Sequence, residues 1–198
     1  PAELRAELDT LSRPIAADAA ALMATSSFLD RLRGTGPLTP ARARQHGALG
    51  PIGEASGFAD DDRLARPYDG YRTLTVPPAR AHATGDALAR LRVRWEEVDS
   101  SFGLLRQAAD DLSAERPTDQ LRVSCQPANG RALGWAEAPQ GEVLYDVALA
   151  GGRVAGCHPR AASFHNLVLM HEVFAGDILT DFPFIEASFG LSVAGVAL

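Results

Sequence analysis

The chain has 198 residues, and its 46% hydrophobic and 22% charged content is typical of a soluble globular protein. A formal net charge of −6 argues against a nucleic-acid-binding surface, which would need clustered cations. No apolar run approaches the ~20 residues of a membrane-spanning helix, and all 19 cationic residues are arginine, which excludes mechanisms that use a catalytic lysine. The two cysteines, Cys125 and Cys157, form no pair motif, so we expect a reducing cytoplasm.

The beginning of the chain is helical in pattern. Apolar residues recur at three- and four-residue steps through residues 2–33. The pattern is interrupted at residues 12–14, where Pro14 either kinks one helix or begins a second. A further short helix is predicted from Thr39, its N-cap, to His46.

Three less regular segments follow. Residues 47–57 are predicted to form a loop, because five of these eleven positions are glycine or proline. The acidic triplet 60–62 lacks the spacing of a calcium loop and favours a solvated helix start. Residues 73–77 alternate like an edge strand that ends at proline.

The longest uninterrupted helix is predicted over residues 86–112. Its buried face is expected to comprise an apolar stripe of Leu88, Leu91, Trp95, Val98, Phe102, Leu105, Ala108 and Leu112. An anion-binding face is conceivable from Arg90, Arg92, Arg94 and Arg106. Acidic residues alternate with these arginines, however, and favour a solvated helix flank. This helix and the first one are expected to form the core of a bundle.

From residue 121 onward the periodicity shortens towards two, which predicts a small antiparallel sheet. Its strands are expected at residues 121–123, 134–142, 143–149 and 153–155. A Gly-Gly pair supplies one turn, and Pro139 and Gly141 supply another. Glu137 and Glu142 bracket this second turn, and Gln140 lies at its tip. The turn is either a loop presented to a site or an exposed hairpin tip.

A last helix is predicted over residues 163–174, followed by an apolar tail at residues 178–198. The fold class is therefore α+β, mainly α, with a long-helix bundle core and a small antiparallel β-sheet appendage. We expect a single domain. Its helical-bundle part occupies residues 1–116, and the sheet, the C-terminal helix and the tail occupy residues 117–198.

The residues by themselves supply no catalytic set. His165 and His171 share the last predicted helix but lie six residues apart, on nearly opposite faces, so they cannot ligate one metal ion. Ser56 lies in Gly-Glu-Ala-Ser-Gly, which is off register for a nucleophile elbow. No P-loop or dinucleotide-binding glycine pattern occurs.

Several stretches, in one order and spacing, carry a family resemblance over nearly the whole chain. They are residues 28–36, 50–57, 66–71, 85–90, 93–97, 137–142, 163–166 and 181–189. Together they resemble the large subunits of membrane-associated nickel–iron hydrogenases of the formate hydrogenlyase type. These are homologous to the 49 kDa subunit of respiratory complex I, an NADH-quinone oxidoreductase. The resemblance implies that the chain corresponds to the C-terminal part of such a subunit.

The resemblance implies partners as well as a fold. It implies an iron–sulfur small subunit, membrane-arm subunits, and a peripheral position on the cytoplasmic face of the inner membrane. Iron–sulfur clusters would lie in partner subunits, quinone would bind in the intact complex, and this chain would hold no cofactor of its own. The candidate site-loop residues are Glu137, Gln140, Glu142, Glu54 and Ser56.

The departures from the family pattern fall on residues that carry chemistry. Gln140 and Glu54 each stand where the family has an arginine. The family's two metal-ligating cysteines would fall at Ser192 and Gly195. Neither residue can hold nickel, because glycine has no side chain and a serine hydroxyl is a hard, weakly acidic ligand. We therefore expect no metal site in this chain.

Three functions stay open at the level of the sequence. The first is a redox-complex subunit of the hydrogenase and complex I class without its own nickel–iron centre. The second is a non-catalytic structural paralogue that acts as a scaffold in such a complex. The third is a free binding domain, against which the apolar tail at residues 178–198 counts, since such a tail normally packs on something. The question whether the chain takes part in an oxidoreductase reaction stays open with them.

Overall fold

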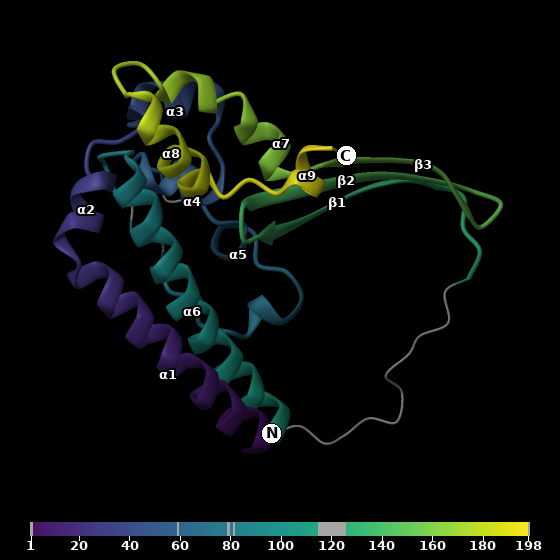
Figure 1. Cartoon of the computed structure of the whole chain (residues 1–198). Helices are drawn as coiled ribbons and strands as arrows, with labels where there is room; N and C mark the ends of the chain where they lie inside the picture. The colour runs from purple at the N-terminus through teal and green to yellow at the C-terminus, as the bar shows by residue number, and fades with distance from the viewer. Residues whose placement is uncertain (1, 59, 79, 81, 115–125, 198) are drawn as a thin grey trace.

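Two long helices lie antiparallel along one flank of the molecule (Figure 1). The computed structural model describes residues 2–58, 60–78, 80, 82–114 and 126–197. The first long helix is α1 (Ala2–Ala24), and the second is α6 (Ala87–Ala114). Within the described ranges, no helix is long and apolar enough to cross a membrane.

The break in the first helical segment lies at Thr25, between α1 and α2 (Ser26–Leu32). Of the two alternatives predicted for Pro14, the start of a second helix is wrong. Pro14 lies inside α1. Arg106 of α6 binds the preceding turn, with its Nε donating to Asp9 at 2.9 Å and its Nη2 donating to Ser12 Oγ at 2.8 Å. These contacts from a neighbouring helix hold the turn that proline would otherwise weaken.

Residues 47–57, predicted to be a loop, contain the helix α4 (Gly50–Ala55), so that prediction is wrong. Every residue of α4 is buried, and the helix packs against α6. The glycines of α4 are explained by other backbone atoms that lie too close to leave room for a side chain. A Cβ on Gly53 would lie 2.7 Å from the carbonyl oxygen of Ala48. The preceding helix α3 (Pro40–His46) is confirmed, and the Thr39 side chain accepts from the Arg42 N–H.

No strand forms at residues 73–77, contrary to the alternating pattern. The polypeptide here follows α5 (Asp62–Ala65) and a short 3₁₀ turn (Asp69–Arg72). Thr75 uses both of its backbone groups on the side chain of Gln107, at 2.8 and 3.2 Å. The prolines that follow have no N–H group to donate to a neighbouring strand. The Gln107 side chain therefore takes the place of a sheet partner for Thr75.

The long helix α6 is confirmed, but its buried face differs from the predicted stripe. Leu105 is 49% exposed and Leu112 is 62% exposed, whereas Val93 and Leu104 are buried. The reason is that α6 passes beneath α2, α4 and α8 in its first half, and mainly α1 accompanies its second half (Figure 1). Helical periodicity identifies a stripe, but the neighbouring elements decide how much of it is covered.

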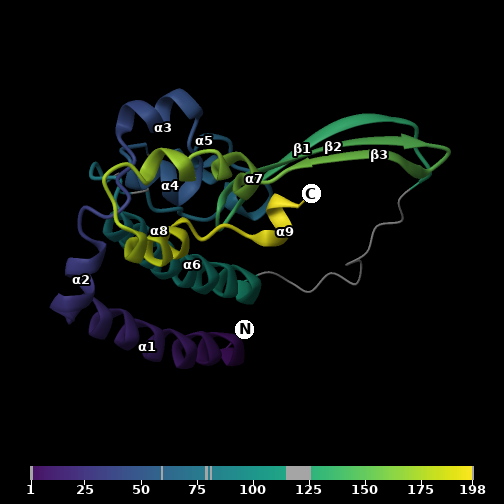
Figure 2. The ribbon, with the colours of Figure 1, turned by 45° about the horizontal axis from the view of Figure 1, so that its top comes forward.

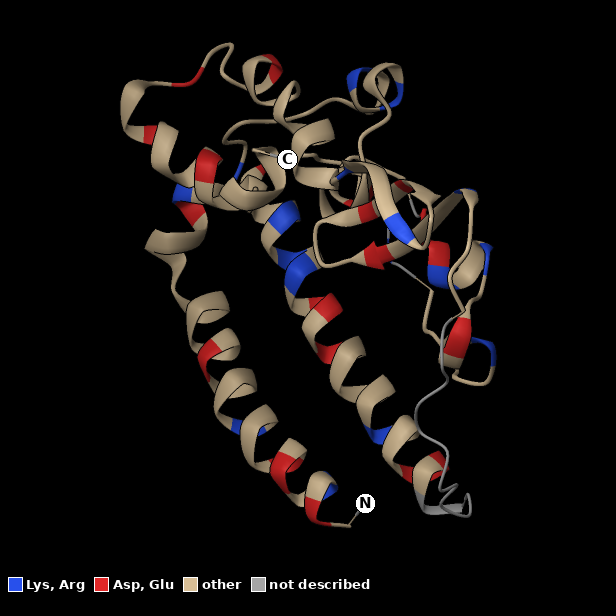
Figure 3. Ribbon diagram, turned by 90° about the vertical axis from the view of Figure 1, so that its right-hand side faces the viewer, with Lys and Arg blue, Asp and Glu red and all other residues tan. Residues whose placement is uncertain are grey.

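The predicted solvated arginine flank of α6 is wrong for two of its members. Arg90 is fully buried and donates through Nη1 to the carbonyl oxygens of Gly36 and Gly85, at 3.0 and 2.5 Å. Arg94 donates to the carbonyl oxygen of Phe189 at 2.6 Å. Figure 3 shows this basic half of α6 followed by acidic residues along the same helix. The two guanidinium groups thus donate to backbone carbonyl groups of segments that pack on α6, and the Gly85 carbonyl also accepts from the Leu38 N–H at 3.0 Å.

The predicted antiparallel sheet is confirmed in strands β1 (Gly130–Ala138), β2 (Gly141–Ala150) and β3 (Arg153–Arg160), in the order β1-β2-β3. Residues 121–123, also predicted as a strand, lie outside the described residues. The sheet projects away from the helices, and its end at the β1–β2 turn lies against them (Figure 2). In that turn, Glu137 is paired with Glu142.

The C-terminal part is more structured than an apolar tail. The single helix predicted at residues 163–174 is wrong, because α7 (Ala162–Leu167) ends early and a 3₁₀ turn (Met170–Val173) follows. Two further helices are α8 (Phe182–Phe189) and α9 (Val193–Val196). The main core contains residues from α3, α4 and the C-terminal part, including Leu38, Ala43, Ile52, Leu169, Val173, Ile185 and Phe189. Ile185 and Phe189 of the predicted tail are therefore buried against the same chain, whereas Ile178, Leu179 and Val193 are exposed.

Candidate functional site

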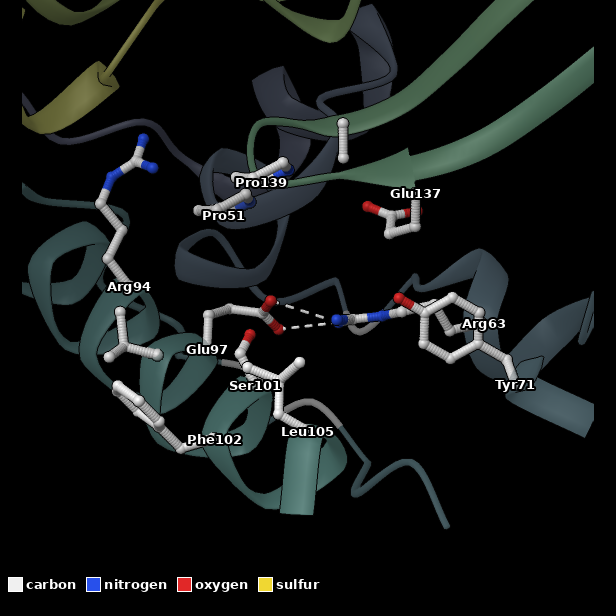
Figure 4. A pocket seen from close by; sticks show the side chains of 12 residues that line it. Pro51, Arg63, Tyr71, Arg94, Glu97, Ser101, Phe102, Leu105, Glu137 and Pro139 are labelled. Atoms are coloured by element: carbon white, nitrogen blue, oxygen red, sulfur yellow. Dashed lines mark hydrogen bonds and ion pairs between the residues drawn. The ribbon is translucent and has the colours of Figure 1, made fainter. Parts of the chain in front are cut away.

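An open hollow of about 480 Å³ lies between α6, the start of α4 and the end of β1 (Figure 4). We call it the apolar hollow. Its wall on α6 is formed by Val98, Phe102 and Leu105. Its polar end is formed by Arg63, Glu97 and Glu137, which come from α5, α6 and β1. An apolar wall with a few convergent polar groups is the usual form of a small-molecule site.

Arg63 is the centre of the polar end. Its Nε and Nη2 donate to both carboxylate oxygens of Asp61 at 2.8 to 3.1 Å, and Nη2 also donates to Glu97 at 3.0 and 3.2 Å. Figure 4 shows the guanidinium reaching Glu97 from the side of Tyr71. Burial lowers the pKa of Arg63, but the two carboxylates outweigh burial and raise it further above its ordinary value. Arg63 is therefore a permanent cation.

The expectation that the acidic triplet is solvated is wrong for two of its residues. Asp61 is 4% exposed and Asp62 is 5% exposed, although Asp61 does begin α5 as its N-cap. Each is buried with a cation as partner, because Asp61 binds Arg63 and Asp62 binds Arg66 at 2.6 Å. A carboxylate can be buried at tolerable cost only with such a partner.

Glu54 and Glu137, two of the predicted site residues, are brought together around this group. Glu54 is 6% exposed, and Glu137 accepts one hydrogen bond, from the Asp62 N–H at 3.3 Å. Burial, followed by the charges of Glu97 and Asp61, raises the pKa of Glu54 to about 8. Burial also raises the pKa of Glu137 to about 8, although the Asp62 N–H opposes this effect. Both pKa values lie far above that of an ordinary glutamate.

Glu142 has the opposite electrostatic environment. Burial alone would raise its pKa, but hydrogen bonds and charge from Arg66 and Arg160 outweigh burial and lower it below the ordinary value. Arg66 lies 2.7 Å from one carboxylate oxygen, and Arg160 binds the other. Glu142 is therefore held as an anion. Its ion pair with Arg66, the residue after α5, connects the end of the sheet to that helix.

The turn that contains Gln140 packs directly on the start of α4. A Cβ added to Gly50 would lie 2.6 Å from the Gln140 carbonyl oxygen, and one added to Gly141 would lie 2.8 Å from the Gly50 nitrogen. Both glycines also have positive φ, +54° and +118°. The turn is thus a docked loop rather than an exposed hairpin tip. Ser56 lies apart from the hollow, and its hydroxyl donates to the Ile52 carbonyl oxygen within α4.

The positions of the missing metal ligands are used for packing. The Ser192 side chain caps α9 by accepting from the Gly195 N–H at 3.2 Å, and the Ser192 N–H donates to Ser163 Oγ at 3.0 Å. A Cβ on Gly195 would lie 3.3 Å from Ser163 and Ala161. These two positions do not fit a nickel–iron group. In the part of the chain that the structure describes, no group of three or more His, Cys, Asp or Glu residues is arranged to hold a metal ion.

The sequence did not identify Asp61, Arg63 or Glu97 as site residues. One signal was available on α6, where Arg90, Arg94 and Glu97 are spaced by four and three residues and so share one face. On that face Arg90 is fully buried, whereas Glu97 lines the apolar hollow. Arg63 gave no comparable signal, because its role depends on partners from α5 and α6 together.

Comparison with known proteins identifies the family. The family model described as the 49 Kd subunit of respiratory-chain NADH dehydrogenase matches residues 2–124. The chain is 35% identical over 158 residues to a subunit of the NADH-quinone oxidoreductase of Syntrophobacter fumaroxidans, covering 78% of this chain and 42% of that protein. It is 35% identical over 163 residues to the carbon monoxide-induced hydrogenase of Rhodospirillum rubrum, covering 82% of this chain and 44% of that protein.

A solved structure has the same fold. It is that of the membrane-bound sulfane sulfur reductase, described as an archaeal respiratory membrane complex, of which one chain matches with a TM-score of 0.88. The match has 24% sequence identity and covers 99% of this chain and 54% of that one. The present chain spans about half the length of the curated relatives named above. The α+β fold with its small sheet is confirmed, and the chain belongs to the family of the 49 kDa subunit of respiratory-chain NADH dehydrogenase.

Proposed function

We propose that this chain is part of a subunit of a membrane-associated redox complex of the NADH-quinone oxidoreductase and hydrogenase type, without its own nickel–iron centre. The observation that carries the second half of the proposal is the use of Ser192 and Gly195. The Ser192 hydroxyl caps α9, and Gly195 packs without a side chain against α7. A thiolate pair at these positions would require both roles to be given up.

The partners that we propose are those implied by the family, and the support for them is that this chain belongs to the family. We propose an iron–sulfur small subunit and membrane-arm subunits, with iron–sulfur clusters in those partners. The position would be peripheral, on the cytoplasmic face of the inner membrane. The sulfane sulfur reductase is described as membrane-bound, which supports membrane association for a chain of this fold.

Quinone is the substrate class that we propose for the intact complex. The apolar hollow supports this assignment through its size, about 480 Å³, and through the ring of Phe102 beside Val98 and Leu105. At its polar end, Nε and Nη2 of Arg63 donate to Asp61 and Glu97, so Nη1 is the group of this guanidinium that remains to donate to a ligand. A quinone headgroup is flat and apolar and carries acceptor oxygens, which suits this combination.

The test is purification of the full-length protein from its native membranes by an affinity tag, with metal analysis and mass spectrometry of the co-purified chains. We expect stoichiometric iron–sulfur and membrane partners and nickel far below one atom per protein. Stoichiometric nickel would refute the metal-free part, and a monodisperse monomer without partners would refute complex membership and favour a free binding domain.

A scaffold without catalytic function is the second candidate. The observation that favours it is the burial of Glu54 and the docking of Gln140, both at positions where the family has an arginine. Quinone reduction by the intact complex separates the two candidates. If Gln140→Ala or Leu105→Trp abolished quinone reduction with assembly unchanged, the scaffold function would be excluded.

A further inference from the structure

Four carboxyl groups surround one guanidinium at the polar end of the apolar hollow. They belong to Glu54 on α4, Asp61 at the start of α5, Glu97 on α6 and Glu137 on β1, and Arg63 is the cation. Nε and Nη2 of Arg63 donate to the carboxylates of Asp61 and Glu97. If all four carboxyl groups were ionised, the group would carry three uncompensated negative charges in a largely buried place.

Glu54 is the least compensated of the four. Its side chain is more than nine-tenths buried and has no hydrogen-bond partner among the described residues. Its backbone carbonyl accepts from the His82 N–H at 2.9 Å and from the Gly57 N–H at 3.2 Å. An ionised carboxylate without a donor in such a place is costly, whereas the neutral acid is not. Glu137 has a single backbone donor, at 3.3 Å.

Glu54 and Glu137 each line an open hollow. Glu54 lines a second hollow of about 440 Å³ beside α6, whose other charged residues are Arg80, Glu96, Glu97 and Asp99. Glu137 lines the apolar hollow and also a third one of about 400 Å³, beside Asp62, Arg66 and Glu142. Glu97 lines both the apolar hollow and the second hollow, and so connects the surroundings of the two glutamates.

We propose that Glu54 and Glu137 form a buried proton-binding site that is loaded at neutral pH and exchanges its protons with water through these hollows. Loading transfers one proton from water to a carboxylate oxygen and gives a neutral carboxylic acid. Release returns the same proton to water, and no electron moves. Asp61 and Glu97 are each hydrogen-bonded to Arg63, whereas the carboxyl groups of Glu54 and Glu137 are not. The site is independent of the proposed redox function.

The experiment follows the side-chain carboxyl carbons of ¹³C-glutamate by NMR while the pH of the purified protein is raised from about 4 to about 10. We expect two glutamate signals with midpoints near pH 8. Glu54→Gln should remove one of them and lower the midpoint of the other, because a neighbouring negative charge has gone. Glu137→Gln should remove the other signal and lower the midpoint of the Glu54 signal. Either variant alone therefore suffices for the test if the other fails to fold.

Glu142→Gln is the matched control. Glu142 lies at the same end of the sheet but is paired with Arg66 and Arg160. Its loss should remove a signal that titrates below the ordinary glutamate range and leave both midpoints near pH 8 in place. Midpoints for Glu54 and Glu137 below about pH 6 would overturn the proposal. So would a downward shift of both midpoints on adding magnesium, calcium or sodium ions, because cations would then neutralise the group.

Discussion

At the scale of single residues, several charged side chains are buried, among them Asp61, Arg63 and Arg90. Arg90 is the clearest case. Its guanidinium binds the carbonyl oxygens of Gly36 and Gly85, donates through Nε to Ser188 Oγ at 2.9 Å, and lies 4.7 Å from the Phe189 ring centroid. Burial lowers its pKa to about 10, with Asp86 opposing the shift. It stays charged at neutral pH and connects α6 to two irregular segments.

Replacing Arg90 by methionine should therefore lower the free energy of unfolding by about 2–4 kcal/mol, because the Gly36 carbonyl loses its donor and the Gly85 carbonyl and the Ser188 hydroxyl each lose one. Arg92 is the control, since it lies on the same helix and is exposed. Arg92→Met should change stability by no more than about 0.5 kcal/mol. Urea denaturation of the three proteins measures both effects. Equal stability of the two variants would contradict the structural role assigned to Arg90.

Glu54 makes the stability of the fold depend on pH. Its folded pKa, about 8, lies above its unfolded value of 4.5, so the folded state binds more protons between these two pH values. The stability that Glu54 contributes is complete below the unfolded pKa and is lost as the pH rises to about 8. Glu54→Gln should reduce the slope of unfolding free energy against pH by up to about 1.4 kcal/mol per pH unit in that window. Denaturation curves at several pH values give the slope, and an unchanged slope would contradict the assignment.

At the scale of elements, a close backbone contact joins the sheet to the helices. Gly50 opens α4 with φ of +54°, and its missing Cβ leaves room for the β1–β2 turn at Gln140 and Gly141. The Glu137 N–H also donates to the Tyr68 hydroxyl at 2.9 Å. The position of Glu137 beside Arg63 follows from these contacts, since they hold the end of β1 against α5.

Gly50→Ala should lower the free energy of unfolding by more than backbone strain alone would. A positive φ costs an alanine roughly 1–2 kcal/mol, and here its Cβ would also meet the Gln140 carbonyl oxygen at 2.6 Å. Gly34 has a similar φ of +70° but nothing within 4 Å of an added Cβ, so Gly34→Ala measures the strain by itself. We expect the larger loss of stability for Gly50→Ala. Equal losses in thermal unfolding would show that the turn does not depend on this contact.

At the scale of the whole molecule, the described core and the sheet differ in how well they are covered. The main core joins α3 and α4 to the C-terminal part. The sheet is held at the β1–β2 turn and extends outward from it (Figure 2), with Leu133 60% exposed and Val154 65% exposed. Exposed apolar side chains far from the core contribute little to keeping the outer half of the sheet closed.

Hydrogen exchange should therefore be uneven along the strands. Amides of α4 and of the first half of α6 should exchange slowest. Amides of β1 and β2 near the Gly130–Leu149 pair should exchange at least about tenfold faster than those near the Glu137–Glu142 pair. Mass-spectrometric exchange of the isolated chain measures this gradient. Uniform protection along the sheet would mean that it closes as one unit with the helices.

Much of the architecture was predictable from local pattern. The period of α6, the Thr39 cap, the antiparallel strands and the Pro139–Gln140 turn all depend on residues close together in the chain. The family and the departures at Gln140, Glu54, Ser192 and Gly195 were likewise readable from the order of short motifs. These features need no knowledge of which segments meet.

Only the tertiary structure decided what is buried and what is paired. The helix α4 forms in a glycine-rich segment because α6 and the β1–β2 turn cover it, and local propensity favours a loop there. The carboxyl groups around Arg63 come from four elements, and the Asp62–Glu137 hydrogen bond joins residues 75 positions apart. Periodicity reports on near neighbours, whereas the charge state of Glu54 and Glu137 depends on desolvation and on charges brought in from distant segments. The sequence by itself thus determined the family and most elements, and the packing of those elements determined the candidate site.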